Sequence, residues 1–306
     1  MTITIALFGY AAVFAVVGPH LLRGGWLDRS PRLALALWHA SAASVLLASG
    51  LASVACYADS GLLRSWLQAL TDRSGITGVI AASTAVAVPA SLVARVVVAA
   101  TRLARSNRTE RRRHLELLAL LGRHDPQLGA TVIPADAPAA YCVPGTHRIV
   151  LTSGAVDVLD DAQVRAVLAH EQAHLAGRHH LVVAWAAVLG RAFPAVPLFG
   201  AIWHTTAHLI ELLADDRTVR RESGRHLATA IAALGCGRSP AVGLAVSGGS
   251  ALARVERLLN PPKPLPLVTR VGGAGAAVSI MAGPVMLAVT PTLLTASLVW
   301  CPHIFG

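Results

Sequence analysis

Charged side chains are scarce in this sequence, since Asp, Glu, Lys and Arg together make up 14% of its 306 residues. A soluble domain has about 25% charged residues. The apolar fraction of a typical soluble domain is also lower than the 54% of this sequence. The shortage of charge argues against an ordinary soluble protein. Because the apolar residues gather in long blocks, the composition predicts a membrane protein.

Cysteine is also rare, and the four cysteines form no CxxC pair, which excludes a zinc site made of cysteines. In the topology argued below, Cys142 and Cys236 lie in the reducing cytoplasm. Cys56 and Cys301 lie near the outer ends of spans. A disulfide between these two is geometrically conceivable, and both alternatives stay open.

Four apolar blocks are long enough to cross a hydrocarbon core of about 30 Å. No basic residue precedes the first block, and Gly18, Pro19 and Arg23 mark its far end, so it does not have the pattern of a signal peptide. We interpret it as an uncleaved anchor with its N-terminus outside. The four predicted spans are residues 3–22, 33–58, 76–101 and 276–300.

Basic residues set the orientation of these spans. They follow the first span, follow the third span and precede the last, and one alternating path places all of them in the cytoplasm, as the positive-inside rule requires. We therefore expect a multi-pass protein of the cell membrane with both termini outside and residues 102–275 in the cytoplasm. The residues are Arg23, Arg29, Arg32, Arg102, Arg105, Arg108, Arg111, Arg112, Arg113, Arg254, Arg257, Lys263 and Arg270.

The net charge of +10 follows largely from these topogenic residues, which lie beside an anionic lipid bilayer. The basic residues are not interleaved with aromatic ones, which make up 5% of the sequence, and no DNA-reading helix is recognisable. Direct binding of nucleic acid is therefore not expected. The run from Arg102 to Arg113 is interpreted as a juxtamembrane helix that extends the third span.

One motif has the residue types and spacing of a catalytic metal site: His170-Glu171-Gln172-Ala173-His174. Positions i and i+4 share a helix face, so both imidazoles can reach one Zn²⁺ while Glu171 stands beside the open coordination position. A capping-box-like start at Asp160 and an apolar stripe at helical spacing predict a helix over about 161–177. The alternative is an ordinary helix with two solvated histidines.

A catalytic zinc site needs a third protein ligand. Glu211 is our candidate, and Asp215, one turn later on the same helix face, can accept a hydrogen bond from a ligand histidine and so orient its ring. His204 and His208, also spaced at i and i+4, remain rival ligands. The alternative interpretation is a carboxylate pair on a helix surface.

Glu171 has the position of a general base, which takes a proton from a water that attacks a peptide carbonyl and passes it to the leaving amine. A protein donor often assists the developing oxyanion. His226, Arg225 and Tyr141 are candidates that the sequence does not separate. His39 and Arg95 lie within predicted spans, where ionisable groups often have a function, but both are near enough to an end to be structural. His179 and His180 are interpreted as capping or packing groups, with metal binding as the alternative.

A small sheet is predicted before the metal-binding helix. Leucines at every third position predict a helix over 114–124, and short β-rich runs broken by Pro and Gly follow over 130–152. In zincins, an edge strand of such a sheet holds an extended peptide by backbone hydrogen bonds. Ile149, Val150 and Leu151 are our candidates for this strand, with a buried structural strand as an equal alternative.

Residues 181–203 are strongly apolar, but Arg191, Pro194 and Pro197 lie near the middle of the run, which argues against a straight span. A single crossing here would also place every later ligand on the opposite side of the membrane from His170. We therefore predict a re-entrant or interfacial helical hairpin, or a buried helix pair.

The segments Val150–Gly154, Val167–His174 and Arg178–His179, followed by Glu211 and Ala214–Asp215, resemble integral-membrane gluzincin peptidases. The short interval from His174 to Glu211 is more similar to the BlaR/MecR antibiotic-sensor peptidases than to the HtpX heat-shock peptidases. The layout of three spans, a cytoplasmic peptidase loop and one more span also resembles BlaR/MecR.

The resemblance implies that His170, His174 and Glu211 bind zinc and that Glu171 is the catalytic base. It also implies a protein substrate such as a BlaI/MecI-type transcriptional repressor. BlaR and MecR carry an extracellular penicillin-binding sensor domain after the last span, whereas this sequence stops at Gly306. Direct sensing of β-lactams is therefore not expected.

These patterns together predict a mainly α membrane protein. Three transmembrane helices fall within 1–101, a cytoplasmic α+β zincin-like metallopeptidase domain with a small β-sheet spans 102–275, and the fourth transmembrane helix with a short outer tail spans 276–306. The expected function is a zinc endopeptidase that cleaves a cytoplasmic regulatory protein. The alternatives are an HtpX-like quality-control protease and a non-catalytic signalling subunit stabilised by zinc. Monomer and homodimer both remain open.

Overall fold

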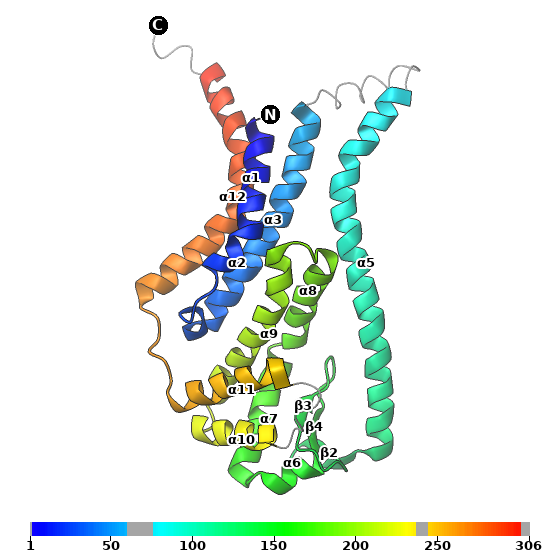
Figure 1. The fold of residues 1–306 in the computed structure, drawn as a ribbon, viewed down its shortest axis with the longest axis vertical. Helices are drawn as coiled ribbons and strands as arrows, with labels where there is room; N and C mark the ends of the chain where they lie inside the picture. Colours follow the sequence, from blue (N-terminus) through cyan, green and yellow to red (C-terminus); the bar gives the residue numbers. More distant parts are fainter. Residues whose placement is uncertain (1, 60–75, 237–243, 301–306) are drawn as a thin grey trace.

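The computed structural model describes residues 2–59, 76–236 and 244–300 (Figure 1). Within these ranges the side chains of 57–59, 76–86, 88, 236, 244–250 and 291–300 are not described. The helices are α1 (Thr2–Val16), α2 (Gly18–Leu21), η1 (Leu27–Arg29), α3 (Pro31–Asp59), α5 (Ile76–Leu121), α6 (Ser153–Val158), α7 (Asp161–Ala176), α8 (His179–Ala192), α9 (Pro197–Thr218), α10 (Gly224–Cys236), α11 (Leu244–Leu259) and α12 (Leu267–Trp300). The strands are β1 (Arg123–Asp125), β2 (Ala130–Ile133), β3 (Ala140–Cys142) and β4 (Ile149–Thr152).

Two halves are arranged along the long axis of the molecule. The upper half of Figure 1 consists of α1, α3, α12 and the first part of α5, and the lower half consists of the sheet with α6, α7, α10 and α11. The start of α1 and the end of α12 lie at the same end of the molecule. The protein is thus mainly helical, with one small sheet at the end away from the long apolar helices.

Two helices of the described residues are long and apolar enough to cross a membrane, Pro31–Cys56 and Leu267–Thr290. These overlap two of the four predicted spans. The first predicted span is shorter than expected, because α1 ends at Val16 and a new helix begins around Pro19, whose ring favours a helix start. The prediction of four spans is therefore met for two. Much of the third, 76–101 in α5, falls where side chains are not described.

The apolar segment 181–203 forms a helical hairpin of α8 and α9 that rises from below between α3 and α5 (Figure 1). Leu198, Phe199 and Ile202 of the hairpin are 0–2% exposed in a core shared with Leu7 and Trp38 of α1 and α3. The hairpin is thus packed on the helices of the upper half.

The two ionisable residues predicted inside spans both contact this hairpin. Arg95 Nε of α5 donates to the carbonyl of Ala192 at 2.9 Å, and its guanidinium carbon lies 5.7 Å from the ring centroid of Phe193. His39 Nε2 of α3 lies 3.4 Å from Thr206 Oγ1. Both therefore attach the hairpin to its neighbours, in agreement with a structural interpretation.

The sheet has the strand order β1-β2-β4-β3, with β2 and β4 parallel and the other neighbouring pairs antiparallel. Strand β4 is paired on both sides, and all of its residues are buried. The prediction that Ile149, Val150 and Leu151 form a substrate-binding edge is therefore wrong, because their backbone groups already pair within the sheet. The edge next to β4 is β3.

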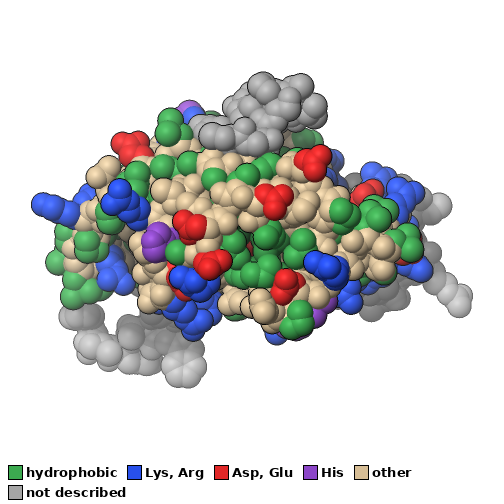
Figure 2. Space-filling model, turned by 90° about the horizontal axis from the view of Figure 1, so that it is seen from below, with side chains coloured by type: hydrophobic (Ala, Val, Ile, Leu, Met, Phe, Trp, Pro, Cys, Tyr) green, Lys and Arg blue, Asp and Glu red, His purple; other side chains and the backbone are tan. Residues whose placement is uncertain are grey.

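The lower end of the molecule carries side chains of both charge signs. Acidic and apolar side chains lie across the middle of this face, and Lys and Arg lie mainly toward its sides (Figure 2). The described part of this face is thus electrostatically mixed.

Replacing Leu151 with Ala is expected to cost roughly 2–5 kcal/mol of folding stability, because the side chain is fully buried between the sheet and α7. A lower apparent melting temperature of the purified protein measures the loss. Val156→Ala on α6 is the control, since Val156 is 38% exposed and its truncation costs within about 0.5 kcal/mol. Equal melting temperatures for the two variants would contradict the position of β4.

Candidate metal centre

Helix α7 carries the two motif histidines, and local hydrogen bonds fix where it begins. The backbone N–H of Gln163 donates to Asp160 Oδ1 at 2.8 Å, and the backbone N–H of Asp160 donates to Gln163 Oε1 at 3.0 Å. This capping box confirms the predicted helix start. Val164, Val167 and Leu168 then bury one face of α7 against the sheet. The histidines therefore stand on a rigid element.

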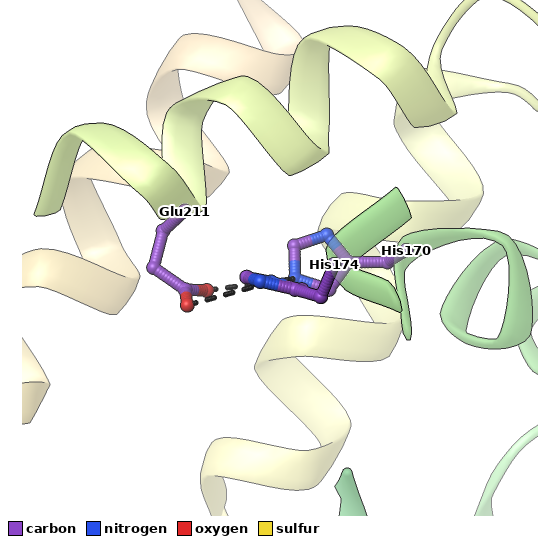
Figure 3. A group of neighbouring side chains, drawn as sticks. All are labelled: His170, His174 and Glu211. Carbon is purple, nitrogen blue, oxygen red and sulfur yellow. Dashed lines mark hydrogen bonds and ion pairs between the residues drawn. The ribbon is translucent and has the colours of Figure 1, made fainter. Parts of the chain in front are cut away.

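Three side chains from two helices converge at one point: His170 and His174 of α7 and Glu211 of α9 (Figure 3). The two Nε2 atoms are 3.1 Å apart, and each lies 3.5 Å from a different oxygen of Glu211. Four zinc ligands at bond lengths of about 2.0–2.1 Å are spaced roughly 3.3–3.4 Å apart in a tetrahedron. The donor set and its spacing therefore fit a zinc ion with a fourth position open.

Each of these histidines has a polar neighbour near its other ring nitrogen. His170 Nδ1 lies 3.1 Å from Asp215 Oδ1, and the Asp215 side chain is 1% exposed. His174 Nδ1 lies 3.1 Å from His179 Nδ1. When the imidazole is neutral, such contacts favour the tautomer whose Nε2 carries no proton and can bind a metal. Asp215 thus lies beside His170, and its role as the hydrogen-bond acceptor that orients the ring stays a prediction. His179, interpreted from sequence as a capping or packing residue, contacts His174.

A sharp connection between α7 and α8 brings His179 back to His174. Arg178 has a φ of 49°, a left-handed conformation that is uncommon for a residue with a side chain. The N–H of Gly177 closes α7 on the carbonyl of Ala173, and a Cβ added to Gly177 would overlap the ring of His179. The missing side chain of Gly177 thus makes room for the contact between the two imidazoles.

Replacing Gly177 with Ala is expected to weaken zinc binding about tenfold, because the displaced His179 no longer orients His174. The backbone itself tolerates Ala, since the φ of Gly177 is −80°. Competition with a chromophoric chelator measures the affinity. Gly200→Ala is the matched control, because its added Cβ meets no atom within 4 Å. Similar losses in both variants would refute the role of His179.

Glu171 follows His170 on α7 and faces strand β3. Burial raises the pKa of its carboxyl group, while the charge of His170 and hydrogen bonding with Cys142 act in the opposite direction. Burial and the Glu171 carboxylate raise the pKa of the Cys142 thiol to about 12, so the thiol remains protonated and can donate to Glu171. A carboxylate with raised proton affinity beside metal ligands is suited to proton transfer.

A groove of about 1200 Å³ leads to the ligands. It lies between α5, the turn after β3 and the hairpin of α8 and α9, and its lining includes His174, His179 and Glu211 together with apolar residues such as Leu103 and Trp185. Pockets for small molecules usually measure about 300–1,000 Å³. The larger groove suits a segment of polypeptide.

Arg254 of α11 also enters the site, although its sequence position suggested only a role in membrane orientation. Its Nε and Nη2 donate to the two oxygens of Asp215 at 2.8 and 2.7 Å. Its Nη1 lies 2.8 Å from Glu211 Oε2, and its Nη2 lies 3.4 Å from His170 Nε2. The available sequence signal was the pair of carboxylates four residues apart on one helix, which needs a cationic partner when buried.

Contacts within this cluster set the charge of its members. Burial would raise the pKa of Glu211 and of Asp215, but hydrogen bonds and charges from His170 and Arg254 outweigh it and lower both values to about 2. Burial would lower the pKa of His170, yet its contacts with both carboxylates raise it to about 9. Burial dominates at His174 and lowers its pKa to about 4. At neutral pH, the imidazole of His170 is therefore protonated at both nitrogens, and a metal would displace the proton on the nitrogen that it binds.

Two candidate donors lie away from the ligands. His226 and Arg225 are exposed on α10, whose buried residues Leu227 and Ala228 pack toward Ala166 of α7. Helix packing thus turns the ring of His226 to the surface. The structure does not bring this predicted transition-state donor to the metal cluster.

The rival ligands and Tyr141 also have other surroundings. His208 Nε2 lies 3.3 Å from Asp28 Oδ1, and His204 is exposed with its ring 4.7 Å from that of Trp203. Tyr141 is half-buried on β3 with its ring against His114 of α5. Among the described residues, the group able to hold a metal is His170, His174 and Glu211.

Comparison with known proteins shows that residues 104–210 match the family model described as peptidase family M48. No curated protein and no solved structure matches the chain. The matched region contains the whole of α7 and ends one residue before Glu211, so the family match does not include the candidate third ligand. The similarity supports a metallopeptidase at the level of this broader family, and the finer resemblance to BlaR/MecR remains a proposal.

Proposed function

We propose that this protein is a membrane-associated zinc endopeptidase that hydrolyses peptide bonds of a cytoplasmic regulatory protein. The observation that carries the proposal is the convergence of His170, His174 and Glu211 at 3.1–3.5 Å beside Glu171. The match to a peptidase family over residues 104–210 supports the reaction class. The two candidate spans support association with a membrane.

Bound zinc would supply a Lewis acid that polarises the substrate carbonyl and makes a water more acidic. Glu171 accepts a proton from the attacking water and delivers it to the leaving amine. The Cys142 thiol would donate to this carboxylate, because its raised pKa keeps the thiol protonated. Asp215 and His179 keep the rings of His170 and His174 oriented.

The substrate is proposed to bind as an extended segment. Strand β3 is at the edge of the described sheet, and its residue Cys142 reaches Glu171. Backbone pairing with Ala140–Cys142 would lead a peptide past the catalytic carboxylate, and the neighbouring groove would accept its side chains. This assigns to β3 the role that the sequence analysis gave to β4.

The resemblance to BlaR/MecR supports a transcriptional repressor of the BlaI/MecI type as substrate. Purified protein in detergent, loaded with zinc, is expected to cut such a repressor at one site, as new termini in mass spectrometry would show. A chelator is expected to stop cleavage, and added zinc to restore it. Cleavage of many unfolded proteins but not of the repressor would favour quality control instead. No turnover with zinc fully bound would eliminate the peptidase proposal.

Zinc affinity is expected to rise about tenfold per pH unit between pH 7 and 9, because a metal binds only the neutral imidazole of His170. The rise levels off above pH 9, where His170 is already deprotonated. The carboxylates, with pKa values near 2, add no dependence in this range. Calorimetric titration in buffers of different ionisation enthalpy counts the released proton. An affinity independent of pH over this interval would contradict the assigned contacts of His170.

A further inference from the structure

Helix α11 crosses the site and supplies one buried cation to the carboxylates of α9. We infer that Arg254 is a positioning residue, which holds Glu211 and Asp215 in the geometry that binds zinc. The inference rests on the proposed zinc site. It extends that site from two helices to three.

The guanidinium of Arg254 matches the two carboxylates in shape. Nε and Nη2 bind the two oxygens of Asp215 at 2.8 and 2.7 Å, while Nη1 reaches Glu211 Oε2 at 2.8 Å. The Arg254 side chain is 13% exposed. Three short contacts from one planar group fix the separation of the carboxylates, which an ammonium group would not reproduce.

Asp215 depends on this contact because its side chain is 1% exposed. A buried carboxylate is costly unless hydrogen bonds and an opposite charge compensate it, so its position depends on its partners. The ring of His170 offers Asp215 one N–H at most, and Arg254 binds both of its oxygens. Without Arg254, the Asp215 side chain is expected to leave this position, and His170 loses the neighbour that orients its ring.

A competing effect has the opposite sign, since a guanidinium near the ligands repels a metal cation. Arg254 already pairs with two carboxylates, so its charge is compensated within the same cluster. Partners that orient metal ligands contribute about 10–100-fold in affinity. We therefore expect orientation to outweigh repulsion.

Arg257 provides a matched control on the same helix. Its Nη2 lies 2.7 Å from Asp216 Oδ1, the residue after Asp215, and its side chain is 15% exposed. Both arginines therefore attach α11 to α9, but Asp216 is not in the described group that can hold a metal. Loss of Arg257 tests the docking of α11 without removing a contact to Glu211 or Asp215.

The test is the zinc affinity of the full chain in detergent, measured by competition with a chromophoric chelator. Arg254→Gln is expected to bind zinc about 10–100-fold more weakly than the wild type. Arg254→Lys keeps the charge that helps α11 to fold and is expected to bind about tenfold more weakly. Arg257→Gln is expected to stay within about threefold of the wild type, because a pair whose acid is partly exposed contributes little.

Thermal unfolding and helix content of the metal-free variants show whether each one folds. If Arg254→Gln does not fold, the zinc affinity of Arg254→Lys decides the test. Unchanged or tighter zinc binding in the folded Arg254 variants would overturn the inference. So would equal losses for the Arg254 and Arg257 variants, which would point to helix docking alone. A wild-type protein that binds no zinc would instead overturn the proposed function.

Discussion

Replacing Glu171 with Gln is expected to lower the rate of peptide hydrolysis by about three orders of magnitude, while zinc binding stays within a few-fold of the wild type. Gln has nearly the same shape as Glu but cannot accept the proton of the attacking water. Glu171 lies outside the group of His170, His174 and Glu211 that fits a metal, so the ligand geometry survives the change. The loss is therefore expected in kcat at full zinc occupancy.

A quenched fluorescent peptide and elemental analysis of the same sample measure rate and metal content together. Gln172→Ala is the matched control, because Gln172 is exposed on the same helix. Its rate is expected to remain close to the wild type. A Glu171→Gln protein that keeps a tenth or more of the wild-type rate would remove Glu171 from its role as the base.

The second large effect is expected for Glu211. Outer partners of metal ligands contribute about 10–100-fold, so Glu211→Ala is expected to weaken zinc binding by roughly 10³-fold or more. Two imidazoles alone leave too few protein ligands for a stable four-coordinate site. The variant also leaves Arg254 without one of its two carboxylates.

Zinc content after dialysis against a weak chelator measures this loss. His204→Asn and His208→Asn are the informative controls, since both histidines are rival ligands by sequence. Their zinc content is expected to equal that of the wild type, because His204 is exposed beside Trp203 and His208 pairs with Asp28. If either histidine variant lost zinc while Glu211→Ala kept it, that histidine and not Glu211 would be the third ligand.

Local patterns were sufficient to predict the centre of the site. The helix start at Asp160, the i, i+4 spacing of His170 and His174, and the same spacing of Glu211 and Asp215 all reflect contacts within one helix turn or two. Such periodicities are visible in sequence because the geometry that produces them is local.

Contacts between distant segments were not visible in the same way. A four-residue apolar strand has the same sequence pattern at the edge and in the centre of a sheet, so the sequence leaves both positions open for β4, and the structure shows the central one. In the sequence, Arg254 has the pattern of an arginine that flanks a membrane span. Its carboxylate partners become visible only when α11 packs on α9. Cys142 likewise reaches Glu171 only through the fold.

The membrane part was predicted less completely than the site. Apolar length alone does not separate a straight span from a helix that breaks, and the first apolar block breaks after Val16. The hairpin at 181–203 was better constrained, because Pro194 and Pro197 mark the interruption and α9 begins at Pro197. The proline positions thus indicate where an apolar helix is interrupted, which hydropathy alone does not.

X-ray absorption at the zinc edge tests the central claim most directly, because it identifies the atoms bound to the metal in the purified chain. We predict one zinc with two imidazole nitrogens and carboxylate or water oxygens at about 2.0–2.2 Å. A sulfur at about 2.3 Å, which Cys142 would supply, a single imidazole, or a chain without zinc would contradict the account.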